Sequence, residues 1–164
     1  MVIQAFITLK ESNVKNDYKL ILAGRKGFGF EEYEKLIVES KYKKDIIVTG
    51  YLSANDIVKL YNEAAAYIFP SIYEGFGSTQ LECMVNHLPL ILSDIPTNRE
   101  VSQEYGLFFE LGNRNKLVEK MLDIVNQKYD YEEKNSLADL ICKKYLWEEL
   151  INDYIKIYKE ISKE

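Results

Sequence analysis

The chain has 164 residues, 47% of them hydrophobic and 29% charged, a balance typical of a soluble globular protein that folds as one domain over residues 1–164. The net charge is −5 and the only basic run, residues 41–44, is short and isolated, which argues against nucleic acid as a partner. No apolar stretch reaches the length of a membrane span, no signal-peptide pattern is present, and Cys83 and Cys142 lack metal or disulfide spacing, so we expect a cytoplasmic protein.

The first predicted element, over residues 4–9, is a helix. A doubly wound domain usually begins with a strand, and no strand pattern precedes this helix. We therefore expect the first strand of the fold to be missing, and the chain to be a fragment or a truncated product.

Five short apolar runs follow, each too short for a helix and most of them ended by a glycine or proline turn signal. Stretches with helical spacing lie between them. Buried strands that alternate with helices predict an α/β fold, a Rossmann-like doubly wound parallel sheet with helices on both faces. The predicted strands are residues 20–23, 46–49, 66–69, 90–92 and 107–109.

Capping residues support the helix predictions. Ser53 can cap a helix that runs to Glu63, and Asn113 can cap one that runs through residues 117–125. At the end of the chain, residues 147–164 form an amphipathic helix with Trp147 near its start. Its apolar stripe could cover the core of this domain; a missing N-terminal domain, which the family resemblance given below implies, is the other surface on which it could pack, and both options stay open.

The segment over residues 69–82 is the most informative part of the chain. An apolar run ends at Pro70, a turn with Glu74 and two glycines follows, and a helix-like stretch then carries Glu82. A strand, a glycine turn and a helix start point main-chain N–H groups at an anion. The two carboxylates can accept hydrogen bonds from hydroxyls, so the pattern fits a nucleotide-sugar.

The same residues carry a family resemblance. Glu-Gly-Phe-Gly-x4-Glu, placed between Pro70-Ser71 and the run over residues 88–94, resembles the Glu-x7-Glu motif of family 4 retaining glycosyltransferases with the GT-B fold. The match is to their C-terminal, donor-binding domain, and it extends over nearly the whole chain, from Ala5 to the C-terminal helix that contains Trp147. In that family the missing first strand leads into a loop with an Arg and a Lys that bind the donor diphosphate.

The resemblance implies a role for each residue of the motif. Glu74 would be the catalytic residue that contacts the transferred sugar, while Glu82 would bind the ribose hydroxyls. The turn and helix start would hold the leaving diphosphate through main-chain N–H groups, and Tyr51 would stack on the nucleobase. The implied donor-binding residues are Glu74, Gly75, Phe76, Gly77, Ser78, Thr79, Glu82 and Tyr51.

Structural alternatives stand beside these roles. Thr79 and Glu82 also match a capping box, in which Glu82 would bond back to the Thr79 N–H. Phe76 could pack under the turn, and Tyr51 could pack on an interdomain face. His87 departs from the family, which commonly has glycine there, although histidine tolerates a left-handed helix end.

We therefore expect the donor-binding domain of a hexosyltransferase-type enzyme that moves a sugar from a UDP, GDP or ADP sugar to an acceptor hydroxyl. No cofactor is expected, and the lack of Asp-x-Asp argues against a required metal. The expected partner is a missing N-terminal acceptor-binding domain, which could attach the protein to the inner face of the cytoplasmic membrane. The chain alone would be inactive or very weak, with weak self-association through its last helix.

Two other functions remain open. The chain could be a non-catalytic nucleotide-binding or docking module that pairs with a separate acceptor-binding subunit. It could also be part of a doubly wound phosphosugar enzyme, such as an epimerase or a phosphorylase, and fold alone does not separate these classes.

Overall fold

The computed structural model describes residues 1–12 and 17–162. Within these ranges the strands are β1 (Leu20–Ala23), β2 (Ile46–Gly50), β3 (Tyr67–Phe69), β4 (Leu90–Ser93) and β5 (Leu107–Phe109). The α-helices are α1 (Val2–Glu11), α2 (Phe30–Glu39), α3 (Ala54–Glu63), α4 (Ser78–Val85), α5 (Pro96–Ser102), α6 (Arg114–Val125), α7 (Tyr131–Lys143) and α8 (Trp147–Ile161). Two short 3₁₀ turns are η1 (Lys43–Asp45) and η2 (Gln103–Tyr105).

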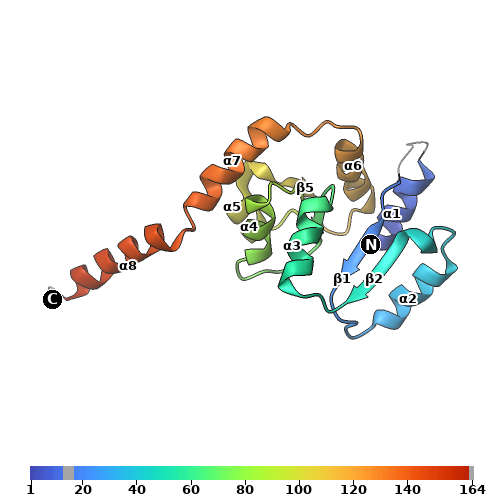
Figure 1. The fold of residues 1–164 in the computed structure, drawn as a ribbon, viewed down its shortest axis with the longest axis horizontal. Helices are drawn as coiled ribbons and strands as arrows, with labels where there is room; N and C mark the ends of the chain where they lie inside the picture. The colour runs from blue at the N-terminus through green and yellow to red at the C-terminus, as the bar shows by residue number, and fades with distance from the viewer. Residues whose placement is uncertain (13–16, 163–164) are drawn as a thin grey trace.

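All five predicted strands are present and every pair between them is parallel, which confirms the α/β prediction. β1 pairs with β2, with Leu20 opposite Ile46. β4 lies between β3 and β5, with Ile91 opposite both Ile68 and Leu107. Parallel strands need crossover connections, and the helices of Figure 1 supply them.

The sheet is divided into two parts, a feature that the sequence pattern did not predict. The order is β1-β2 in one part and β3-β4-β5 in the other. Among the described residues, β1 and β3 each have a strand partner on one side only. The two parts are nevertheless packed together, because Leu22 of β1 and Ile68 of β3 contact the same apolar cluster.

Apolar clusters cover both faces of the β3-β4-β5 part of the sheet, as predicted, whereas Ile47 of β2 is 38% exposed. Ile91 points into a cluster that α1 and α6 line with Phe6, Leu9 and Leu117. Its neighbours on the strand, Leu90 and Leu92, point into a second cluster lined by α4, α5 and α7. This alternation is the two-residue period of a strand buried on both faces.

Local capping agrees with the sequence. The Ser53 hydroxyl accepts a hydrogen bond from the Asp56 N–H at 3.2 Å, and the Asn113 side chain accepts one from the Lys116 N–H at 3.1 Å. α4 ends as expected of a left-handed cap, since His87 has φ 52° and the Leu88 N–H bonds to the Cys83 carbonyl at 2.9 Å.

α8 extends away from the rest of the molecule in Figure 1. Every described residue of this helix except Leu150 is exposed; Trp147 is 72% exposed and Tyr158 is 69% exposed. The option that the stripe covers the core of this domain is therefore wrong. Lys163 and Glu164, which the prediction included in the helix, lie outside the described residues.

Candidate functional site

The turn over residues 70–77 connects β3 to α4 and lies at the carboxyl end of the sheet, where ligands bind in open parallel sheets. Gly77 caps α4 with φ 80°, a left-handed conformation that favours glycine. A Cβ atom at this position would clash with the Gln80 Nε2 atom. Gly75 has open space where its Cβ would be. Gly77 is thus required by the fold, whereas Gly75 leaves the turn surface bare.

Glu74 is held in place by two neighbours. The Ser71 hydroxyl donates a hydrogen bond to Glu74 Oε1 at 2.7 Å, and the Thr97 hydroxyl donates one to the Glu74 main-chain carbonyl at 3.0 Å. The side chain is half-buried. Glu74 is therefore an oriented carboxylate and not a freely solvated loop residue.

Glu82 is exposed on α4, where Tyr61 of α3 donates a hydrogen bond to its Oε2 atom at 3.1 Å. The capping-box alternative is wrong, because α4 begins at Ser78 and Thr79 lies inside its first turn. A capping box requires its Ser or Thr at the N-cap. The helix start near Gly77 is the one that the family resemblance implied.

Two groups close to Glu82, the Tyr67 hydroxyl and the Cys83 thiol, have raised pKa values. Burial raises the pKa of the Tyr67 hydroxyl to about 12, with further contributions from Cys83 and Glu82. Burial also raises the pKa of the Cys83 thiol to about 12, again with a contribution from Glu82. These groups stay neutral at physiological pH, and a protonated, buried thiol is a packing group, not a nucleophile.

Ser78 and Thr79 form the first turn of α4, where the leading N–H groups of a helix have no partner inside the helix. Phe76 lies beside them, and its ring packs edge-on against the Tyr145 ring at a centroid distance of 5.3 Å. The side chain is 42% exposed, so it packs on one side and faces solvent on the other.

Tyr51 belongs to the other part of the sheet, directly after β2. Its ring is 75% exposed and lies under the Arg25 guanidinium, 5.4 Å from it. Gly24 and Gly50, which precede the two side chains, are joined by a hydrogen bond of 3.0 Å from the Gly24 N–H to the Gly50 carbonyl. The structure brings Glu74, Glu82 and the glycine turn together on one segment, and places Tyr51 on a second loop at the carboxyl ends of the strands.

Sequence reasoning missed the side chains that support the turn. Thr97 and Asn98 of α5, Ser93 of β4 and Gln80 of α4 form hydrogen bonds beneath it. For Thr97 and Asn98 the only sequence signal is Pro96 at the start of α5, which indicates a helix start but not its partners.

The residues predicted for the site do not line the open hollow of about 670 Å³ between the starts of α1 and α6, which includes Met1, Gln4 and residues 110–115. In residues 1–12 and 17–162, no group of three His, Cys, Asp or Glu side chains is arranged to hold a metal ion. None of the helices described is both long and apolar enough to cross a membrane.

Comparison with known proteins identifies relatives of this arrangement. The O-antigen chain mannosyltransferase RfbU of Salmonella typhimurium is 33% identical over 102 residues, which are 61% of this chain and 29% of that protein. The O-antigen chain mannosyltransferase B of Escherichia coli is 27% identical over 142 residues, 87% of this chain and 37% of that protein. The chain thus spans about a third of the length of these relatives.

Solved structures show the same fold. A mutant of S. aureus TarM, in complex with Fondaparinux, alpha-GlcNAc-glycerol and UDP, superposes with a TM-score of 0.77 at 18% identity, over 96% of this chain and 32% of that one. Residues 1–147 match the family described as glycosyl transferases group 1. Because that match covers nearly the whole chain, the chain belongs to the group 1 glycosyl transferases.

Proposed function

We propose that this chain is the donor-binding domain of a retaining glycosyltransferase that moves a hexose from a nucleoside-diphosphate sugar to an acceptor hydroxyl. The two relatives are named mannosyltransferases, and the TarM neighbour was solved with UDP, which supports this class of donor. The observation that carries the proposal is the fixed, half-buried Glu74 next to a glycine turn and the start of α4.

The proposed chemistry follows from that arrangement. The bond between the anomeric carbon and the diphosphate oxygen breaks, the acceptor oxygen bonds to that carbon from the same face, and the acceptor proton leaves with the diphosphate. Main-chain N–H groups from Gly75 to Thr79, at the positive end of α4, would stabilise the departing charge. Glu74 would orient the sugar and Glu82 the ribose, each as a hydrogen-bond acceptor.

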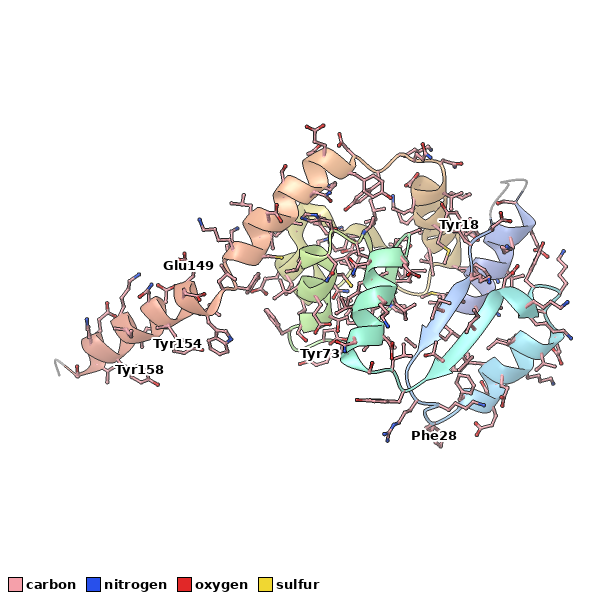
Figure 2. The ribbon with its side chains drawn as sticks, viewed as in Figure 1. Tyr18, Phe28, Tyr73, Glu149, Tyr154 and Tyr158 are labelled. Atoms are coloured by element: carbon pink, nitrogen blue, oxygen red, sulfur yellow. The ribbon has the colours of Figure 1, made fainter. Side chains whose placement is uncertain are left out.

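Calorimetry with UDP, GDP and ADP and their sugars tests the proposal. We expect the chain to bind one of these series, and the double variant Glu74→Ala/Glu82→Ala to bind about tenfold or more weakly, because two acceptors are lost. Glu149→Ala, on the exposed α8, removes a remote carboxylate as a control (Figure 2). Undiminished binding by the double variant would refute the site.

The single variant Glu82→Gln tests the proposed binding role of Glu82 separately from that of Glu74. Since Glu82 caps nothing in this structure, we expect its replacement to lower donor affinity and leave the melting temperature unchanged. An unchanged donor affinity would contradict the proposed binding role of Glu82.

We further propose that the active protein is longer than this chain. The matched regions are only 29% and 37% of the two mannosyltransferases, and β1 and β3 each have one edge without a strand partner among the described residues, which supports the proposal. A further strand and an acceptor-binding domain could come from the same polypeptide. They could also come from a separate subunit, and in that case this chain is the docking module considered above.

A further inference from the structure

Four polar side chains of the described residues are fully buried, and all four belong to one hydrogen-bond network beneath the glycine turn: Gln80, Ser93, Asn98 and Ser102. At its centre, the Asn98 Oδ1 atom accepts a hydrogen bond from Gln80 Nε2 at 2.9 Å, while Asn98 Nδ2 donates to the Ser93 carbonyl at 2.8 Å. The Ser93 hydroxyl in turn donates to the Ser71 carbonyl at 2.5 Å. The network therefore joins α4, α5 and β4 to the start of the turn.

The first turn of α5 supports the turn over residues 70–77 at two points. Thr97 donates a hydrogen bond to the main-chain carbonyl of Glu74 at 3.0 Å. Its neighbour Asn98 holds the Gln80 amide, which occupies the space where a Cβ on Gly77 would lie. Thr97 and Asn98, which are neighbours on α5, thus support both ends of the glycine turn. Thr97 supports it at Glu74, and Asn98 supports it through Gln80.

α5 is itself anchored to the sheet. Arg99 donates two hydrogen bonds to the Asp94 carboxylate, at 2.6 and 2.7 Å, directly after β4. The Arg99 guanidinium also lies 4.2 Å from the centroid of the Phe108 ring, on β5. Bidentate Arg–carboxylate contacts of this kind define both distance and orientation, so the pair fixes how α5 sits beside the end of β4.

Core stability alone does not explain the network. The Gln80 Oε1 atom is buried and has no hydrogen-bond partner among the described residues, and a buried, unpaired carbonyl is destabilising. An apolar side chain of similar size would avoid that cost. What the Gln80 amide does provide is contact with Gly77 on one side and with Asn98 on the other.

We propose that Thr97 and Asn98 are positioning residues, which hold the turn over residues 74–77 in the conformation that receives the donor diphosphate and sugar. They act through Glu74 and Gln80 and do not themselves touch the ligand. The nature of the ligand rests on the proposed function, whereas the support of the turn does not.

Amide hydrogen exchange of the full, ligand-free chain tests the support directly. Thr97→Val removes the hydroxyl without changing the shape of the side chain, and we expect the amides of residues 72–79 to exchange about three- to tenfold faster. Thr97→Ser keeps the hydroxyl and should restore slow exchange. Thr8→Val removes a hydroxyl that also donates to a main-chain carbonyl, at 3.0 Å in α1, and should leave residues 72–79 unchanged.

Nucleotide affinity provides the second measurement, with UDP, GDP and ADP as probes. We expect Thr97→Val to weaken binding about three- to tenfold with little change in melting temperature, and Thr97→Ser to bind like the unmodified chain. Gln80→Met, which keeps the length of the side chain but removes the amide, should show the same two effects and serves if Thr97→Val folds poorly.

The outcomes separate the two proposals. If the unmodified chain binds none of the three nucleotides, the proposed function fails, and exchange in residues 72–79 still decides the role of Thr97. If Thr97→Val and Gln80→Met lower the melting temperature but leave both turn exchange and affinity unchanged, the network is merely structural and the inference is overturned.

Discussion

At the scale of single residues, the two glycines of the turn have different physical roles. Gly77 combines a φ of 80° with a position where a Cβ would clash with Gln80 Nε2, whereas Gly75 has neither constraint. We expect Gly77→Ala to lower the free energy of unfolding by about 1–3 kcal/mol, because the left-handed conformation and the displaced amide both cost energy.

Gly75→Ala is the matched control for Gly77→Ala. Its methyl group enters open space, so the free energy of unfolding should change by less than about 0.5 kcal/mol. Nucleotide affinity should nevertheless fall, because the methyl group would stand between the main chain and the diphosphate. Urea unfolding and calorimetry measure the two effects, and equal stability losses in both variants would contradict this assignment.

The sequence identified the residues that make up the turn but not those that support it. Glu74, Gly77 and Glu82 follow one another closely, so their spacing is visible in the chain. Thr97 lies 23 residues beyond Glu74, and its hydrogen bond to the Glu74 carbonyl exists only once α5 packs beside the turn. The choice between a helix N-cap and a binding role for Glu82 also needed the structure, because both patterns occupy the same residues.

At the scale of elements, strand positions were predicted well because each strand is a short apolar run ended by a turn signal. β2 and β4 each extend one residue further than predicted, and β3 begins one residue later. α5 and α7 were not predicted as elements; α5 spans only residues 96–102, and Tyr131–Lys143 has a weak apolar stripe. Short or mostly polar helices depend on tertiary packing for their stability.

α8 is the element whose apolar residues have no described partner within the chain. Figure 2 shows Glu149, Tyr154 and Tyr158 along this helix, away from the other elements. The apolar side chains that repeat at helical spacing are Trp147, Leu150, Ile151, Tyr154, Ile155, Tyr158 and Ile161. Contiguous apolar surface of this kind marks an interaction site or favours self-association.

We expect Ile151→Glu/Tyr154→Glu to reduce concentration-dependent self-association, because the substitutions place charge on the apolar stripe. The melting temperature of the protein should stay unchanged, since neither side chain contributes to either core cluster. Asn152→Ala, on the polar face of the same helix, is the control. Sedimentation velocity at several concentrations measures the effect, and equal association of all three proteins would contradict a role for the stripe.

At the scale of the whole molecule, the proposal of a longer protein predicts one more strand in the divided sheet. β2 pairs with one edge of β1, and β4 pairs with one edge of β3; among the described residues, the other edge of each strand has no strand partner. α1 and α2 pack against each other, so they cover the same face of the sheet. Right-handed crossovers through helices on one face add successive strands in one direction across the sheet. A strand leading into α1 would therefore reach the free edge of β1, between the two parts.

Main-chain exchange in this chain alone tests whether that place is open. The N–H groups of a parallel strand alternate between its two edges, so some of those in β1 and β3 face the division while others bond to β2 or β4. We expect the amides of β1 and β3 that face the division to exchange far faster than the amides of β4, which is paired on both sides. Residue-resolved exchange by NMR provides the measurement.

An extended chain that supplies the strand should slow the same amides to the level of β4, because each would then gain a carbonyl partner. Uniformly slow exchange in this chain would mean that packing already seals both edges, and no added strand would be needed to complete the sheet.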